Sequence, residues 1–469
     1  MQYDITRDTF DPANQYSRVL MRQGSVMLDA DWNEQHDILL DYMRTLARDL
    51  FGRHAGPSEN PGFEIIASAD PNWQAHLNDR IGADPLYQSL ALQQLLPDTL
   101  IVGPGRYYVD GIMVTNDAPL ICQLQLGSIG VQDSLLIYLD VWERLVTSAQ
   151  NDAIREKALG GPETCGRTQV CWRVRALKKP THMTDIDIGT FIDNLPQSGS
   201  GSLRARAQQI SPATAPCVIA PDARYRGLEN HLYRVEIHQG GEATGRADGA
   251  TIKWSRDNGA AVFSIRSFGA NMETVEVETL GRDRRFGLQQ GDWVEVINDR
   301  IAVNGITGPL LQVVKTCGDS LTVTLKSGPD AGADLASIVK DGTALHPILR
   351  LWTPASAGQS AGAMPIKGYD DDHLTDGWTD LEEGIQVRLS SGGLYKPGDY
   401  WLIPARVATG DIEWPRDRPV SGTDYMPAAR PPHGVLHHYA PLVIIQNDPT
   451  IGHVVATDRR CRIARLPCL

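Results

Sequence analysis

SLLIYLDVWERLVT, residues 134–147, is the stretch that decides the fold class. Its first half is an almost unbroken run of Leu, Ile and Tyr, and apolar and polar residues begin to alternate only after it. Such a run is typical of a strand that is covered on both faces. The stretch therefore predicts a strand near the centre of a sheet.

Short apolar runs broken by Gly, Pro, Asn and Asp surround this strand. They predict antiparallel strands or hairpins, because β-branched and aromatic residues are concentrated in them and turn residues separate them. The first group comprises residues 100–115, 168–177, 231–241 and 250–268. A later group is expected to return to the same sheet and comprises residues 346–352, 384–390, 398–406 and 440–446.

Further short strands with regularly spaced turns are expected at residues 274–283, 290–299, 310–316 and 320–326. Their spacing predicts a small barrel. We therefore expect a mainly β fold with an N-terminal helix, α+β overall, in which an antiparallel β-sandwich-like body carries an inserted small β-barrel. The expected parts are an N-terminal hairpin and helix at 1–55, the first part of the body at 56–272, the barrel insert at 273–330, and return strands with a C-terminal tail at 331–469.

The first 55 residues differ from this β pattern. Apolar runs on either side of Gly24 predict a short hairpin or kinked strand, because Gly readily adopts a positive φ. Asp31, followed three residues later by Glu34, has the pattern of a helix N-cap. A helix is then expected as far as Gly52, because no Gly or Pro interrupts the intervening residues.

The predicted helix carries a broad apolar stripe at spacings of three to four residues. Trp32 begins the stripe, and Leu39, Met43, Leu46 and Leu50 continue it. Two interpretations remain open: the helix packs on its own domain, or the stripe forms a short coiled-coil or bundle seam between identical chains. Leu39, Met43, Leu46 and Leu50 are the candidates for such an oligomer seam.

Composition limits the classes of function. The 469 residues include 44 Lys and Arg against 57 Asp and Glu, a net charge of −13, and 42% hydrophobic residues. A water-soluble protein of roughly two to four domains fits these values. Its acidic balance disfavours nucleic acid and bare anionic membranes as partners. Without a signal-peptide pattern or a long apolar run, synthesis in the cytoplasm and no direct membrane insertion are expected.

Cysteines and acidic or histidine clusters give little sign of metal chemistry. The sequence has no CxxC pair, so its cysteines are expected to be mostly reduced and packed. They are Cys122, Cys165, Cys171, Cys217, Cys317, Cys461 and Cys468. The segment Asp370–His373 lacks the alternating ligands of a calcium loop. Prolines around His433, His437 and His438 argue against a zinc-binding helix. We predict no metal site and no cofactor.

No motif for catalysis stands out. The chain has no GxSxG elbow, and GPGRYY at 103–108 precedes a strand rather than the helix that a phosphate-binding loop requires. Asp140 with Glu143 and Glu382 with Glu383 are paired carboxylates of the kind that glycosidases use, at unknown distances in space. We predict no catalytic residues.

Tryptophans in or beside the predicted strands are expected to be buried as core pillars, because their large rings stabilise a core most when covered. An exposed aromatic platform for a ligand is the alternative. These residues are Trp142, Trp172, Trp254, Trp293, Trp352, Trp401 and Trp414.

The opening TRDTFDPANQYSRVLMRQGSVMLDADWNEQ strongly resembles the N-terminal signature of an uncharacterised family of phage-tail-like proteins associated with contractile injection systems. Further blocks resemble the same family in order, so the likeness covers almost the whole chain. They are DVWER at 140–144, IREKALGGPETCGRTQVCWRVRAL at 154–177, YRGLENHLYRVEIHQGG at 225–241, TIKWSRDNGAAVFSI at 251–265, GDWVEVIND at 291–299, GDYWLIPAR at 398–406 and PPHGVLHHYAP at 431–441.

This resemblance implies a structural protein of such a particle. A looser likeness to the N-termini of phage tail-fibre and baseplate proteins implies an attachment role for the matching positions, with folding of the N-terminal cap as the alternative. These positions are Tyr16, Arg18, Val19, Leu20, Gln23, Gly24, Leu28, Asp31, Trp32, Asn33, Glu34 and Gln35. The implied partners are other baseplate or fibre subunits and identical copies, with a homotrimer favoured.

Two departures from the family pattern qualify this expectation. Cys165 stands where members often carry Ala or Thr, and Cys171 on the following strand gives it a candidate disulfide partner in a released particle. The chain also closes with DRRCRIARLPCL at 458–469, directly after the shared blocks, which favours an adaptor over a receptor-binding subunit. A carbohydrate-binding or glycan-hydrolysing protein and a delivered cargo are the alternative functions.

Overall fold

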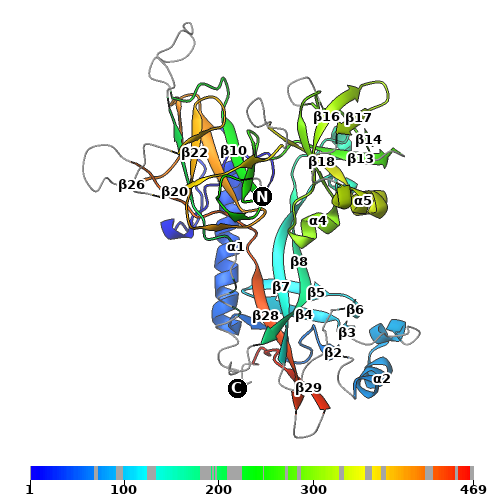
Figure 1. Cartoon of the computed structure of the whole chain (residues 1–469). Helices are drawn as coiled ribbons and strands as arrows, with labels where there is room; N and C mark the ends of the chain where they lie inside the picture. Colours follow the sequence, from blue (N-terminus) through cyan, green and yellow to red (C-terminus); the bar gives the residue numbers. More distant parts are fainter. Residues whose placement is uncertain are drawn as a thin grey trace. The chain divides into compact units, whose positions relative to one another are not determined.

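Figure 1 shows the computed structural model of the chain. The residues that it describes are 2–67, 72–90, 99–123, 134–179, 192, 195, 198–208, 224–246, 248–269, 273–281, 287–326, 332–353, 362–370, 377–417, 426–448 and 453–464. The chain divides into two compact units, which are described separately. Unit 1 comprises residues 1–8, 145–169 and 197–435, and unit 2 comprises residues 9–144, 170–196 and 436–469.

Within the described residues, unit 2 contains three sheets. The largest has the order β29 (His453–Asp458), β28 (His438–Asp448), β7 (Ser134–Val146) and β8 (Arg167–Lys179). The other two have the orders β1 (His54–Ala55), β4 (Gly105–Val109), β5 (Ile112–Asn116), and β2 (Ile65–Ala67), β3 (Thr99–Val102), β6 (Leu120–Gln123). Side chains from all three share one core, including Leu100, Tyr107 and Leu139. Because β7 lies between β28 and β8, the prediction of a central strand is confirmed.

Unit 1 contains a β-sandwich. One sheet has the order β19 (Met364–Pro365), β12 (Thr251–Ser255), β10 (His231–Gln239), β24 (Tyr400–Arg406) and β25 (Asp411–Ile412). The other pairs β22 (Ile385–Ser390) with β20 (Gly368–Tyr369), β21 (Thr379–Asp380) and β9 (Leu203–Ala207). Tyr233 and Trp401 from the first sheet and Val387 from the second belong to the same core. The predicted sandwich is confirmed.

Unit 1 also contains the predicted barrel, which is closed. Its strand order is β13 (Val262–Phe268), β14 (Thr274–Val277), β17 (Thr322–Lys326), β16 (Leu310–Cys317), β15 (Trp293–Ile297) and β18 (Ile348–Trp352). β18 pairs with both β13 and β15 and so closes the barrel. The expectation that residues 346–352 return to the body sheet is wrong, because the barrel needs the segments on both sides of 273–330 to close.

The helices and shorter elements complete the described structure. The α-helices are α1 (Asp29–Phe51), α2 (Trp73–Ala83), α4 (Asp299–Asn304) and α5 (Gly332–Asp341). The 3-10 helices are η1 (Pro12–Asn14), η2 (Pro85–Leu90), η3 (Asp152–Ile154), η4 (Lys157–Leu159) and η5 (Gly342–Leu345). Two short pairs join β11 (Gly241–Glu242) to β23 (Leu394–Tyr395) and β26 (Arg416–Asp417) to β27 (Met426–Pro427). No described helix has both the length and the apolar character that a membrane crossing requires.

The N-terminal segment differs from its prediction in two details. Around Gly24, which has φ 75°, the chain makes a turn in which the Ser25 amide donates to the Arg22 carbonyl. Residues 15–28 form no strand, so the hairpin is wrong. Asp31 is not the N-cap either, because the helix begins at Asp29 after an extended Leu28 that makes no side-chain cap.

Most of the tryptophans are core residues, as predicted. Trp142, Trp254, Trp293, Trp352 and Trp401 are buried. Two others are partly buried and pack against these cores, namely Trp172 and Trp414. No disulfide is formed by the described cysteines, the candidate pair included, which are Cys122, Cys165, Cys171, Cys317 and Cys461. Cys165 and Cys461 are exposed rather than packed, and Cys217 and Cys468 lie outside the described residues.

Candidate docking surface

The segment between η1 and α1, residues 15–28, is here called the arm. Along it most side chains are exposed, although many of them are large and apolar. Leu20 is 74% exposed and Val26 is 79% exposed. The other exposed apolar residues of the arm are Tyr16, Met21, Met27 and Leu28. Such a concentration of exposed apolar side chains is unusual on a protein surface and makes the arm a candidate interaction site.

The arm is tied to α1 by side-chain hydrogen bonds. Gln35 Oε1 accepts from the Val19 amide at 2.9 Å. Glu34 Oε2 accepts from the Thr9 hydroxyl at 2.6 Å, just before the arm begins. Both acceptors belong to the first turns of α1, so the arm and the helix form one continuous surface.

The inner face of α1 contacts the rest of unit 2 through polar groups and close backbone packing. Arg44 forms an ion pair of 2.7 Å with Glu143 of β7. Gly111, in the β4–β5 turn, packs so closely against Arg44 that an added Cβ would lie 2.3 Å from the Arg44 carbonyl oxygen. Phe51, at the end of α1, contacts the ring of Tyr108.

The outer face of α1, the long blue helix in Figure 1, is apolar and exposed. Its large exposed apolar residues are Trp32, Leu39, Leu40, Tyr42, Met43, Leu46 and Leu50. Only Ala30 and Ile38 of this helix are buried. An ordinary surface helix turns its apolar side chains toward the core and its polar ones toward water. In α1 this arrangement is largely reversed, so the seam candidates do not pack on the helix's own domain.

The sequence-predicted attachment residues divide into two sets. Exposed and available for contact are Tyr16, Arg18, Leu20, Gln23, Gly24, Leu28, Trp32 and Asn33. Half-buried are Val19, Asp31, Glu34 and Gln35. Because Glu34 and Gln35 accept the hydrogen bonds described above, these two fold the N-terminal segment rather than offer free groups to a partner.

The candidate carboxylate Asp140 is buried in unit 2 and surrounded by cations. His437 Nδ1 lies 2.5 Å from one carboxylate oxygen, and Arg173 Nε donates to the other at 2.9 Å. Burial raises the pKa of Asp140, but the hydrogen bonds from His437 and Arg173 outweigh it and hold the pKa below its usual value. Glu143 is paired with Arg44. Asp140 and Glu143 are therefore engaged in ion pairs and are not a free pair of carboxylates.

The three histidines of the PPHGVLHHYAP block do not converge on one site. His438 contacts Asp110 at 2.9 Å, whereas His437 contacts Asp140. The ring of His433 packs on Tyr400 in unit 1. Within the described part of the chain, no group of three or more His, Cys, Asp or Glu is placed to hold a metal ion.

The other carboxylate candidates also lie in local networks. Glu382 accepts from Tyr233 at 2.9 Å and pairs with Arg256 at 2.7 Å, and burial raises its pKa. Glu383 occupies a turn with φ 50°. In the acidic segment 370–373, Asp370 accepts from the Ser391 hydroxyl, and the remaining three residues lie outside the described residues.

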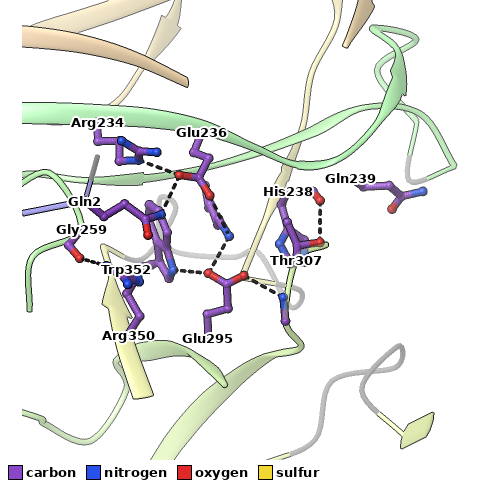
Figure 2. A network of polar contacts seen from close by, with 12 residues as sticks. Gln2, Arg234, Glu236, His238, Gln239, Gly259, Glu295, Thr307, Arg350 and Trp352 are labelled. Atoms are coloured by element: carbon purple, nitrogen blue, oxygen red, sulfur yellow. Dashed lines mark hydrogen bonds and ion pairs between the residues drawn. The ribbon is translucent and has the colours of Figure 1, made fainter. Parts of the chain in front are cut away.

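A buried ionic network, which sequence analysis missed, connects the sandwich and the barrel of unit 1 (Figure 2). Lys253 of β12 lies 3.3 Å from Glu236 of β10 and 2.6 Å from Glu295 of β15. Arg234 pairs with Glu236 at 2.6 Å, and the Trp352 indole donates to Glu295 at 2.9 Å. The signal in the sequence is a single charged residue within an otherwise uncharged strand, as in TIKWS and WVEVI.

The network joins the sandwich to the barrel within unit 1. Burial raises the pKa of Glu236, but Arg234 and Lys253 outweigh it and lower the pKa to about 2. The Gln2 side chain donates to the same carboxylate at 2.8 Å, as Figure 2 shows. Arg234, Glu236, Lys253 and Glu295 are all buried, so none of these charges is presented to a ligand in solution.

The fold and the exposed surface together define a class: a β-rich protein whose N-terminal arm and helix carry an exposed apolar face. A model of the family of unknown function DUF6519 matches residues 1–188 and 196–463, and the chain belongs to this family. No curated protein and no solved structure matches the chain.

Proposed function

We propose that this protein is a structural subunit of a phage-tail-like contractile injection particle, attached at the baseplate or fibre network as an adaptor or fibre-like subunit. The arm and the start of α1 are the attachment surface. The resemblance of this segment to tail attachment segments supports the assignment to a particle. The exposure of Tyr16, Leu20 and Trp32 supports the role of the segment, because it leaves large apolar groups in water until a partner covers them.

Aromatic side chains of this kind are the usual anchors of protein interfaces. Tyr and Trp are enriched among the residues that contribute most to binding, particularly when neighbouring contacts exclude water. Tyr16 therefore serves as the central anchor, with the exposed Leu20 and Val26 of the same arm. The net charge of −13 does not oppose docking here, because the surface of the arm is apolar and its charged residues are Arg18 and Arg22.

The test is incorporation of the full chain into particles. Leu20→Asp combined with Val26→Asp places two charges on the arm, and both side chains are so exposed that the fold is expected to survive. Particles purified from cells that produce this double variant should contain at least tenfold less of the subunit than particles with the wild-type protein. Leu228→Asp, at a leucine that is also 74% exposed, is the matched control and should be incorporated normally.

Quantitative immunoblotting of the particles, with thermal melting of each purified variant, separates failed docking from failed folding. Normal incorporation of the folded double variant would show that the arm is not the attachment surface. Absence of the wild-type protein from purified particles would overturn the assignment to a particle.

A further inference from the structure

The exposed face of α1 has the spacing of a coiled-coil seam. Successive residues on it alternate in steps of four and three, at Trp32, His36, Leu39, Met43, Leu46 and Leu50. This is the heptad pattern in which Trp32, Leu39 and Leu46 take one core position, called d, and His36, Met43 and Leu50 take the other, called a. All six side chains are exposed, and Met43 and Leu50 are 66% and 67% exposed.

The remaining faces of the helix show why this seam is free. The residues opposite the seam are buried or half-buried, namely Ala30, Asp31, Glu34, Asp37, Ile38, Asp41, Arg44 and Thr45. The helix is thus held by its own chain along its back, through contacts such as the Arg44–Glu143 ion pair. A second helix can approach the seam without displacing any of these contacts.

The chemistry of the seam selects a second copy of α1 as the occupant. The seam requires a partner helix with the same spacing over the same length. The other described helices are shorter, and apolar residues such as Leu77 of α2 and Ile338 of α5 are buried in their own cores. A partner with the matching heptads is therefore α1 of another copy.

The uncharged surface of the seam permits this occupant despite the charge of the chain. Each copy carries a net charge of −13, so two copies repel except where they present uncharged surface. The positions that flank a coiled-coil core are uncharged along most of α1, at Asn33, Gln35, Leu40, Tyr42 and Ala47, and Asp49 is the exception near the C-terminal end. The seam is thus an uncharged strip along which like-charged copies can meet.

We propose that α1 helices of three copies associate through this seam as a parallel, in-register coiled coil. The orientation follows from His36, which in a parallel coil faces the same residue of the other copies. In an antiparallel pair it would face apolar residues, and a polar residue at a core position selects the register in which it meets its own kind. The number of helices, three rather than two, follows from Leu40 and Tyr42. These residues extend the apolar face beyond the two core positions, and two neighbouring helices cover them better than one.

The first experiment measures the mass of the full purified chain by light scattering at several concentrations. The wild type should show three times the mass of one chain. Leu39→Glu combined with Leu46→Glu should reduce it to one chain, because charges would face one another in two core layers. Leu228→Glu, at an exposed leucine of unit 1, is the matched control and should leave the mass unchanged.

The second experiment tests orientation and register. Leu46→Cys should form an interchain disulfide on mild oxidation, because equivalent d positions adjoin in a parallel coil. Non-reducing gels should show this disulfide in excess of any that the wild type forms. Arg48 is exposed but lies on the side of the helix opposite the seam, so Arg48→Cys should add none. A single-chain mass for the wild type at all concentrations would overturn the proposal. A mass of two chains, or no added disulfide with Leu46→Cys, would also overturn it.

This proposal goes beyond docking to the particle and does not depend on it. Light scattering and oxidation use the purified protein alone, whereas the arm variants are tested in particles. A trimer that is absent from particles would contradict only the proposed function, and a single chain that docks through the arm would contradict only the coiled coil.

Discussion

At the residue scale, Lys253, Glu236 and Glu295 of unit 1 are buried and neutralise one another's charges. Lys253 lies between Glu236 and Glu295, and its ammonium group stands 4.5 Å from the centre of the Trp352 ring. Sequence analysis identified Trp352 as a core residue but gave no role to the charges, because a charged residue in a strand is usually exposed. Only the packing of the barrel against the sandwich within unit 1 determines which carboxylate each cation meets.

Replacing Lys253 with Met should lower the free energy of unfolding of unit 1 by about 3–5 kcal/mol, since it leaves two buried carboxylates without their shared cation. Urea denaturation at pH 7 measures the change. Lys326→Met, at an exposed lysine at the end of β17, should change stability by less than about 0.5 kcal/mol. Equal stability of the two variants would show that the network does not stabilise the fold.

His238 gives unit 1 a pH dependence. Burial, with a contribution from Lys253, lowers its pKa from 6.5 to about 4, and its Nδ1 has no hydrogen-bond partner. The unfolded chain therefore binds a proton near pH 6.5 that the folded chain binds only near pH 4. Stability from neutral His238 is fully present above pH 6.5 and is lost as the pH falls from 6.5 to about 4.

His238→Phe should remove this part of the acid sensitivity. The ring keeps a similar shape but does not titrate, so stability between pH 6.5 and 4 should fall less steeply than in the wild type. Thermal melting across this pH range is the measurement, with His76→Phe, at an exposed histidine of α2, as control. A slope as steep as that of the wild type would mean that another group causes the acid sensitivity.

At the element scale, the sequence predicted the strands better than their partners. The central strand β7, the sandwich and the middle strands of the barrel followed from apolar runs and turn residues. The assignment of residues 346–352 failed because the pairing of a strand depends on which distant segment closes the barrel, and periodicity does not encode that. The end of α1 at Gly52 was predicted, while its start was not, because the helix begins without a side-chain cap.

The contact between α1 and the β4–β5 turn depends on Gly111. A Cβ at this position would lie 2.3 Å from the Arg44 carbonyl oxygen, and the residue has φ 80°. Gly111→Ala should lower the free energy of unfolding by about 1–3 kcal/mol more than Gly392→Ala, because the latter shares a positive φ of 66° but has open space around it. Thermal or urea unfolding of both variants checks this, and equal losses would rule out a steric role for Gly111.

At the scale of the whole molecule, the net charge of the chain and the exposed apolar face of α1 both bear on the proposed association of copies. The sequence predicted the apolar stripe of α1 but left open whether it is covered by its own domain. The structure resolves this, because the polar inner face, and not the stripe, contacts unit 2. Composition alone does not supply this answer, since it depends on which side of the helix the β4–β5 turn and β7 occupy.

Salt should strengthen the association of copies. Acidic copies repel one another, and added salt screens this repulsion without weakening an apolar seam. The concentration at which half of the chains are trimeric should fall severalfold between 20 mM and 500 mM NaCl, as measured by sedimentation. Weaker association at high salt would indicate that ion pairs, rather than the apolar seam, hold the copies together.

The pairing of β7 with β28 has a consequence for biosynthesis. Leu139 of β7 lies opposite Ala440 of β28, so the sheet of unit 2 lacks an inner strand until the ribosome has passed residue 448. Most of unit 1, residues 197–435, has emerged before then and can fold first. During this interval β7 has an open edge, and nascent chains on one messenger are exposed to mispairing. A pause in translation before residue 448 would prolong the exposure of this edge.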